Sequence, residues 1–460
     1  MLRKYIGTRQ FYRTVMALTL PIMIQNGITN FVSMLDNIMV GRIDTVQMTG
    51  VSIANQLVFV FNLCIFGAVS GAGILGAQYY GRGDHDGVRF TFRFKLLFTL
   101  LLTGGCIALF FFCGDSLISL YLQGEGSTAD RAATLACARD YLRIILIGLI
   151  PYTAVQCYSS TLRESGQSLP PMMAGLVAVA VNLGLNTVLI FGYLGAPRLG
   201  AVGAAIATVA SRFAELLVVA IWTRRHSRRN HFILGAYRSL YIPAPLVRQV
   251  FANGLPLMLN ETMWAAGMAA LNQCYSVRGL DVVSANTVAQ TFFNVFAVSF
   301  QSIGAAIGIL LGQLLGAGKC DEARDSSRKM IAFSVAVSIA IGAVYAVAAI
   351  FIPQIYNTTD EVRLLATRLM QLSALVFPLD AFVNAAYFAL RSGGKTLITI
   401  LFDSCFVWCV QVPAAMLLSR CTAMPILPLY LICQMLCLIK CVLGFIFVRR
   451  GTWARTLVAE

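Results

Sequence analysis

Long apolar segments recur along almost the whole 460-residue chain, and each is long enough to cross a lipid bilayer. A transmembrane helix needs about 20 predominantly apolar residues to span a hydrocarbon core of about 30 Å. The segments are 14–40, 47–73, 91–114, 138–160, 169–192, 199–223, 247–274, 284–312, 329–352, 364–390, 396–418 and 423–448. Because a lipid-exposed backbone must satisfy its own hydrogen bonds, the sequence predicts an all-α integral membrane protein with twelve transmembrane helices.

Composition and charge agree with a membrane location and indicate an orientation. Hydrophobic residues make up 58% of the chain and charged residues 12%, whereas soluble domains contain about 25% charged residues. Residues 14–40 are too long for the apolar region of a cleaved signal peptide. The net charge of +15 is concentrated in alternate loops, most strongly in TRRHSRRN (223–230). By the positive-inside rule we expect both termini in the cytosol of a bacterial cell, at its plasma (inner) membrane. The charge therefore reports orientation and says little about partners, although a basic cytosolic face would attract anionic membrane lipids. We expect no nucleic acid as a partner.

The chain contains two copies of one unit. GILGAQYYGRG (73–83) matches GILLGQLLGAG (308–318) at an offset of 235 residues, and Pro21 matches Pro256 at the same offset. A later pair, LRESGQS and LRSGGKT, matches at an offset of 228. Repeats of this kind are typical of secondary transporters, with the substrate bound near the membrane midplane between the halves.

The repeat defines the expected domains. Each copy spans six predicted helices, an even number, so both copies enter the membrane from the same side. We therefore expect two pseudo-symmetric six-helix bundles, an N-lobe at 1–223 and a C-lobe at 247–460, joined by a basic cytosolic linker at 224–246.

One face of the first predicted helix is polar and includes an acid, Asp36. At 100° per residue, the polar side chains of this helix lie within an arc of about 140°; they are Gln25, Asn26, Thr29, Asn30, Ser33, Asp36 and Asn37. A polar face in a membrane helix contacts protein or water and not lipid. The alternative is that Asp36 is an interfacial acid near the outer end of the helix.

The second copy carries polar residues of a different kind. Asn272 occupies the repeat position of Asp36, and Glu261 lies on nearly the same face of the seventh helix. Asp380 and Asn384 are one turn apart in the tenth helix. Ionisable groups inside a membrane are costly and mark functional sites. A buried carboxyl can be neutralised by a proton or by a cation such as Na⁺, and competition with a cationic substrate would make the protein an antiporter.

Other charged groups in the predicted membrane interior have structural interpretations. Arg212 and Glu215 are three residues apart on one helix and should pair. Lys440 is expected to extend towards the cytosolic interface, and we assign no role to Asp403. The five acids counted in the membrane interior outnumber the two bases counted there, Arg212 and Lys440, which favours a cationic cargo; the acids are Asp36, Glu215, Glu261, Asp380 and Asp403.

The sequence has no feature that indicates an enzyme. The three histidines lie in predicted cytosolic loops. Cys433, Cys437 and Cys441 follow one face of the last helix without an accompanying histidine or acid, which favours a packing role. We expect no enzymatic activity and no cofactor, and a membrane receptor or enzyme is the least favoured alternative.

Four fragments together resemble the multidrug and toxic compound extrusion (MATE) transporters, in particular the DinF-like and NorM-like groups. They are Pro21 with LDNIMVGR (35–42), GAQYYGRGD (76–84), NLGLNTVLIFG (182–192) and LRSGG (390–394). The resemblance covers essentially the whole chain. It implies two six-helix bundles around a central cavity, and the export of organic cations and other amphipathic compounds in exchange for Na⁺ or H⁺.

The resemblance also implies particular ion-coupling residues. Asp36, Asn182, Asn186 and Thr208 match the N-lobe cation site, where Na⁺ is the metal ion expected. Many DinF-like members have Asp at the position of Asn186, so the choice between Na⁺ and H⁺ stays open. In the C-lobe, Asp380 matches the NorM-like acid of the tenth helix. Glu261 lies five residues after Pro256 and not about eight as in NorM-like members, so its depth would differ.

We therefore expect a secondary active multidrug or organic-cation efflux antiporter that works by alternating access of two lobes, as a monomer. The alternative on the same superfamily fold is a flippase of a lipid-linked precursor. Expected substrate contacts, each with packing as the alternative, are Asn26, Asn30, Tyr152, Met263, Trp264, Met268, Asn272, Phe292, Phe293 and Asn384.

Overall fold

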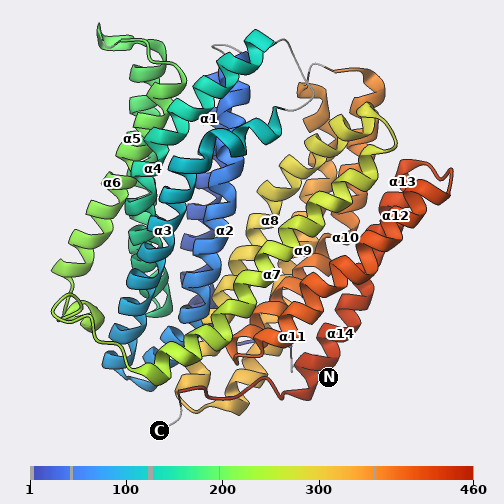
Figure 1. Ribbon diagram of the computed structural model, residues 1–460. Coiled ribbons are helices and arrows are strands. Elements are labelled where there is room, and N and C mark those ends of the chain that lie inside the picture. The colour runs from blue at the N-terminus through green and yellow to red at the C-terminus, as the bar shows by residue number, and fades with distance from the viewer. Residues whose placement is uncertain (1–4, 42–44, 123–127, 196, 357, 459–460) are drawn as a thin grey trace. The chain divides into compact units, whose positions relative to one another are not determined.

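The computed structural model describes residues 5–41, 45–122, 128–195, 197–356 and 358–458, without the side chains of residues 32–38, 40, 41, 45, 128, 129 and 194. Within this part of the chain the regular structure is helical and contains no strand, which confirms the predicted all-α class. Figure 1 shows the helices as long rods.

Each predicted transmembrane segment lies on helical structure, and several of the helices extend beyond the predicted ends by up to ten residues. The first half forms α1 (Arg9–Gly41), α2 (Thr45–Arg82), α3 (His85–Tyr121), α4 (Thr128–Glu164), α5 (Leu169–Phe191) and α6 (Ala201–Arg225). The second half begins with α7 (Ala244–Ser276), α8 (Leu280–Gly316), α9 (Cys320–Phe351) and α10 (Asp360–Ser392). The eleventh segment comprises α11 (Thr396–Ile400), η5 (Leu401–Cys405), η6 (Val407–Gln411) and α12 (Val412–Cys421), and the twelfth comprises α13 (Ile426–Met435) and α14 (Cys437–Arg450). Short 3₁₀ turns are η2 (Tyr193–Gly195), η3 (His231–Ile233) and η4 (Ile352–Ile355).

Among the described residues, nine helical stretches are long and apolar enough to cross a membrane by length and composition. The three other predicted spans lie in α1, α4 and α7, which are also helical but are richer in polar residues. The eleventh span differs from a regular helix because η5 and η6 are π-helical. Such turns are rare and are frequent at functional sites.

The contacts between residues divide the chain into two compact units. Unit 1 comprises Met1–Met23, Ala77–Gly83 and Ala252–Glu460, and unit 2 comprises Ile24–Gly76 and Asp84–Phe251, as far as these ranges are described. The predicted lobe and linker boundaries stay a prediction.

Unit 2 is built on α3, α4, α5 and α6. The pairs α5 and α6, α4 and α6, and α3 and α4 pack side by side (Figure 1). Small residues at the start of α6 allow a close approach to α5, since a Cβ on Gly203 would lie 2.7 Å from the backbone oxygen of Leu189. Small residues at helix interfaces are typical of membrane proteins because they bring backbones together.

Unit 1 is built on α8, α9, α10 and α14, with α10 packing against the other three. The C-terminal end of α2 also belongs to this unit and crosses α8 at the repeated motif. A Cβ on Gly81 would overlap the backbone oxygen of Gln313, and a Cβ on Gly316 would overlap the backbone oxygen of Gln78. Gly81 and Gly316, like Gln78 and Gln313, are 235 residues apart. The repeated motif therefore packs reciprocally against its own copy.

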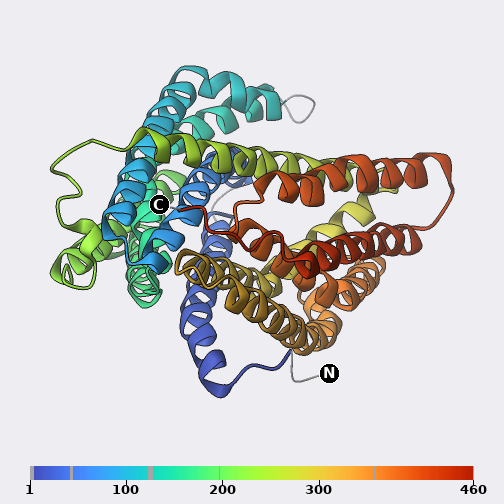
Figure 2. The ribbon, with the colours of Figure 1, turned by 90° about the horizontal axis from the view of Figure 1, so that it is seen from below.

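The C-terminal tail, residues 451–458, packs against the crossing of α2 and α8 through hydrogen bonds. The Gln78 side chain is buried, donates to the Ser392 carbonyl oxygen (3.0 Å) and accepts from the Leu457 amide (2.7 Å). Arg82 donates to the Val458 carbonyl oxygen (2.6 Å). Trp453 is 1% exposed. Figure 2 shows the tail (red) running from the end of α14 to the C-terminus.

Candidate functional site

The predicted N-lobe residues of α5 and α6 lie together in unit 2. Asn186 donates from Nδ2 to Asn182 Oδ1 at 3.0 Å, and Asn182 donates from Nδ2 to Thr208 Oγ1 at 3.4 Å. Asn182 and Asn186 are both buried. Their spacing of one helical turn places them on the face of α5 that packs against α6. The Asp36 side chain lies outside the described residues, so its place in this site stays a prediction.

The neighbouring ion pair of α6 forms as predicted. Arg212 Nη1 lies 3.2 Å from Glu215 Oε2, and Glu215 is buried. The Arg212 guanidinium also lies 4.9 Å from the centre of the Tyr152 ring, a cation–π contact. Tyr152, an expected substrate contact, is therefore engaged by a cation of the protein itself.

In unit 1, Glu261 belongs to a hydrogen-bonded network that connects α7, α10 and the π-helical η5. The Tyr387 hydroxyl donates to Glu261 Oε1 at 3.2 Å. Asn260 donates from Nδ2 to the Tyr387 hydroxyl (3.4 Å) and to Asp403 Oδ2 (3.2 Å). Ser404 Oγ donates to the backbone oxygen of Asn260 at 2.7 Å. The π turn presents Asp403 and Ser404 together to Asn260.

Lys440 completes the network, and here the sequence-based expectation was wrong. Lys440 is 7% exposed, and its Nζ lies 2.8 Å from Asp403 Oδ1. A buried ammonium is stable only with a compensating anion, and Asp403 provides it. Lys440 therefore does not extend to the interface, and Asp403, previously without a role, is its counter-ion.

Asp380 lies apart from this hydrogen-bonded chain. Its Oδ1 accepts a hydrogen bond from the Cys437 thiol at 3.5 Å. Within the described residues, neither Glu261 nor Asp380 forms an ion pair with a lysine or arginine, and no hydrogen bond joins the two. Their joint role in one C-lobe site stays a prediction. The cysteine face of α14 thus supplies a donor as well as packing.

The predicted amide contacts fall into different environments. Asn272 accepts from Gln290 Nε2 (2.8 Å) and from Asn286 Nδ2 (3.2 Å), which forms an amide cluster between α7 and α8. Asn384 Oδ1 is buried and has no hydrogen-bond partner among the described residues. Asn26 is half-buried and Asn30 is exposed on α1.

The predicted apolar contacts are also divided. Met268, Phe292 and Phe293 pack against the core of unit 1, which agrees with the packing alternative. Met263 and Trp264 are each 37% exposed.

Sequence reasoning missed the buried ion pair of Lys95 and Glu164. The two atoms Nζ and Oε1 are 2.6 Å apart, and the side chains are 0% and 5% exposed. Ser160 also donates to Glu164, and Lys95 donates to Thr161 Oγ1 at 3.3 Å. Lys95 lies inside the predicted span 91–114, so a charge within an apolar segment could have revealed it.

Asn260 and Tyr387 were missed for a different reason. Asn260 directly precedes Glu261 and so lies off the face shared by Glu261 and Asn272. Tyr387 follows Asp380 by seven residues, which is about two helical turns. That spacing places it on the same face of α10 and could have suggested it.

Comparison with known proteins identifies the family of this chain. The profile of the MatE family matches residues 21–188 and 256–417. A probable multidrug resistance protein, NorM of Thermotoga maritima, is 22% identical over 454 residues, which are 97% of this chain and 94% of that protein. A probable multidrug resistance protein, YoeA of Bacillus subtilis, is 25% identical over 421 residues, 90% and 89% of the two chains.

Solved structures share the fold. The outward-facing structure of a multidrug resistance MATE family transporter of the MOP superfamily matches with a TM-score of 0.87 and 18% identity over 98% of each chain. A MOP superfamily transporter from Pyrococcus furiosus, described as having a binding pocket of reverse polarity, matches with a TM-score of 0.86 and 17% identity over 98% of each chain. The family profile covers most of the chain in both repeated halves, and the chain belongs to the MatE family, whose members are membrane transporters and not enzymes.

Proposed function

We propose that this protein is a secondary active efflux antiporter that exports amphipathic or cationic small molecules in exchange for Na⁺ or H⁺. The relatives named for multidrug resistance in Thermotoga maritima and Bacillus subtilis support this class of cargo. The basic loops support a plasma-membrane location with both termini in the cytosol.

The observation that carries the proposal is the difference between three acids in unit 1. Asp403 is neutralised by Lys440, whereas Glu261 and Asp380 have no ion-pair partner among the described residues. Arg391 and Lys440 act electrostatically on Glu261 and Asp380 but form no salt bridge with them. A buried carboxylate without a salt-bridge partner is costly and favours a bound proton or cation. Glu261 and Asp380 can therefore exchange a coupling ion for a cationic substrate, while Asp403 cannot do so without breaking its ion pair.

In unit 2 we propose a second coupling site formed by Asp36, Asn182, Asn186 and Thr208. Carboxylate, amide and hydroxyl oxygens are the ligands that hard cations prefer. The short separations between Asn182, Asn186 and Thr208 support a shared site. With Asn at position 186, Asp36 would be its single carboxylate.

We propose that transport proceeds by alternating access. The reciprocal contact of Gly81 with Gln313 and of Gly316 with Gln78 supports a two-state element. Because the two helices meet through backbone atoms at this crossing, the contact is either fully closed or separated. Two discrete arrangements of this kind are what a conformational switch requires. Access from the cytosol would require the inner ends of α2 and α8 to part.

A flippase of a lipid-linked precursor is the second candidate. The binding pocket of the structurally similar Pyrococcus furiosus transporter is described as having a reverse polarity that suggests a different function. Glu261 and Asp380, which lack ion-pair partners, favour a cation over a negatively charged lipid precursor in this chain.

The test is ethidium extrusion from vesicles that contain the purified protein, first under a Na⁺ gradient and then under a pH gradient. We expect extrusion under at least one gradient. Asp36→Asn and Asp380→Asn should abolish it at unchanged expression, and Asp115→Asn, an exposed acid of α3, should extrude normally. Normal extrusion by both Asp36→Asn and Asp380→Asn would refute their coupling roles. Transport that ignores both gradients would refute the antiport mechanism.

A further inference from the structure

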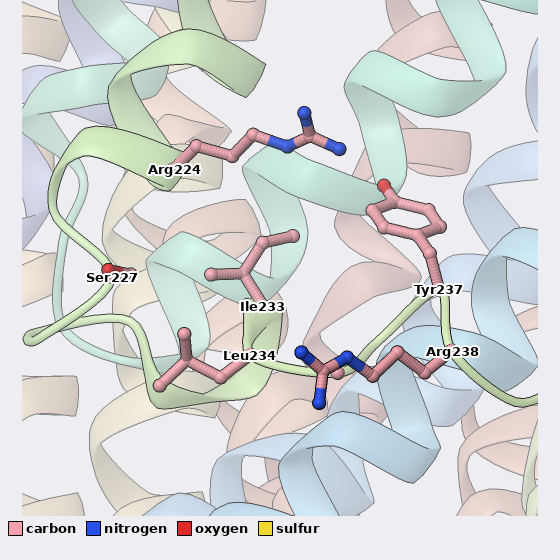
Figure 3. Close-up of a pocket in the computed structure, with 7 residues that line it drawn as sticks. Arg224, Ser227, Ile233, Leu234, Tyr237 and Arg238 are labelled. Carbon is pink, nitrogen blue, oxygen red and sulfur yellow. The ribbon is translucent and has the colours of Figure 1, made fainter.

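The segment that joins α6 to α7 is strongly basic and contains no acid. Between residues 216 and 260 there are six arginines and neither Asp nor Glu. This segment folds into a pocket of about 300 Å³ in unit 2. Six of the residues that line it are labelled in Figure 3: Arg224, Ser227, Ile233, Leu234, Tyr237 and Arg238.

The pocket is held in shape by a buried arginine of α3. Arg93 is 7% exposed, and it donates to the carbonyl oxygens of Gly235 (2.6 Å), Ala236 (2.8 Å) and Tyr241 (3.1 Å). A buried guanidinium that donates to three carbonyls fixes the path of the chain. The loop therefore has a fixed conformation and forms one side of the pocket.

Further contacts fix the opposite part of the loop. The Tyr237 hydroxyl is hydrogen-bonded to the Tyr158 hydroxyl of α4. Asn230 is 1% exposed, donates to the His226 carbonyl oxygen (3.1 Å) and accepts from Gln167 (2.8 Å). Both ends of the loop are thus tied to the helices of unit 2.

The charged groups of the pocket are available to a ligand. Figure 3 shows the side chains of Arg224 and Arg238 on opposite sides of Ile233. In the part of the chain that the structure describes, no acid lies within salt-bridge distance of either arginine. Arg224 lies 6.0 Å from the Tyr237 ring centre, and a phenol is neutral at pH 7. The pocket therefore combines two positive charges with apolar walls.

This combination matches a molecule with a phosphate group and an apolar portion. Guanidinium groups bind phosphate oxygens in bidentate fashion, and Ile233 and Leu234 offer apolar surface beside them. Arg224 lies in the last turn of α6, a helix long and apolar enough to cross a membrane. The pocket therefore lies at the end of a helix that is able to span a bilayer, and the ends of such helices meet the lipid headgroups.

We propose that this pocket binds the headgroup of an anionic phospholipid of the cytosolic leaflet, through Arg224 and Arg238. The proposal is independent of the coupling ion and of the exported substrate.

The test compares two double variants with the same loss of charge. Arg224→Gln/Arg238→Gln removes the charges that line the pocket, and Arg228→Gln/Arg229→Gln removes two exposed arginines of the same loop that do not line it. Binding of phosphatidylglycerol and of phosphatidylcholine to the purified full-length protein is measured by native mass spectrometry. Since a basic residue near an anionic lipid surface contributes about 1 kcal/mol, we expect about 30-fold weaker phosphatidylglycerol binding in the first variant. The second variant should bind as the unmodified protein does.

Other outcomes would overturn the proposal. Equal loss in both variants would mean general attraction to a basic face. Displacement of the lipid by millimolar inorganic phosphate would assign the pocket to a soluble anion. Leu234→Glu places a carboxylate at a residue that is 50% exposed, so it should fold and should also weaken binding. Undiminished binding in Leu234→Glu would refute the proposal even if the arginine variants were unstable.

Discussion

Alanine in place of Gly81 should loosen the crossing between the C-terminal ends of α2 and α8. Its Cβ would overlap the backbone oxygen of Gln313, and the reciprocal Gly316→Ala would overlap the backbone oxygen of Gln78. Backbone atoms cannot rotate away as a side chain can, so the two helices must separate. Extra carbon atoms in a packed contact cost about 1–3 kcal/mol.

The control separates this cost from the higher helix propensity of alanine, worth about 1 kcal/mol over glycine. Gly105 lies in α3, and a Cβ there would meet no atom within 4 Å. Gly105→Ala therefore gains the propensity without the overlap. Relative to this control, Gly81→Ala and Gly316→Ala should shift the crossing towards its open form by about 5- to 150-fold.

Hydrogen–deuterium exchange measures this opening in the full-length protein without any added label. Exchange in the segments 73–83 and 308–318 should accelerate in both variants and stay unchanged in Gly105→Ala. Because one separation relieves both overlaps, the double variant should show less than the sum of the two effects. Unchanged or slower exchange in Gly81→Ala would refute the view that glycine is needed at this crossing.

Three further predictions follow from the buried polar contacts. Lys95→Met should lower the free energy of unfolding by about 3–5 kcal/mol because Glu164 stays buried without its cation. In thermal unfolding, the double variant Lys95→Met/Glu164→Gln should lose less stability than Lys95→Met. An equal loss of stability in the two variants would contradict the pairing. Lys440→Met should impair ethidium extrusion by leaving the Asp403 carboxylate uncompensated, and adding Asp403→Asn should restore part of it; no restoration would mean that Lys440 acts independently of Asp403. Gln78→Leu should destabilise the protein by about 1–3 kcal/mol and expose the C-terminal tail, so that a protease removes the tail faster. An unchanged cleavage rate would argue against the view that Gln78 holds the tail in place.

The fold was largely predictable because it follows from local properties of the sequence. Apolar length determines where helices form in a membrane, and all twelve predicted segments lie on helical structure. The π turns of the eleventh segment were not predictable from hydropathy. In the first of these turns, Asp403 and Ser404 contact Asn260, which belongs to a helix more than a hundred residues away in the sequence.

The candidate site was predictable only in part, for a related reason. A helical wheel groups residues on one helix, as it did for Asn182 and Asn186. It does not identify the partner that a neighbouring helix contributes. The lysine that neutralises Asp403 comes from α14, so Lys440 was expected at the interface and not inside the bundle.

Residues that match between the two repeats and residues that differ between them have different proposed roles. The glycines and glutamines of the α2–α8 crossing keep the repeat, because a reciprocal backbone contact needs the same residue on both sides. The charged residues do not follow the repeat, since Asn272 stands at the repeat position of Asp36 and Ser392 at that of Glu164. In the proposed antiporter, a symmetric crossing with asymmetric charges would let both halves move alike while each binds a different ion or substrate group. Substitutions at the crossing should therefore change the opening equilibrium, whereas substitutions of single acids should change coupling and leave that equilibrium in place.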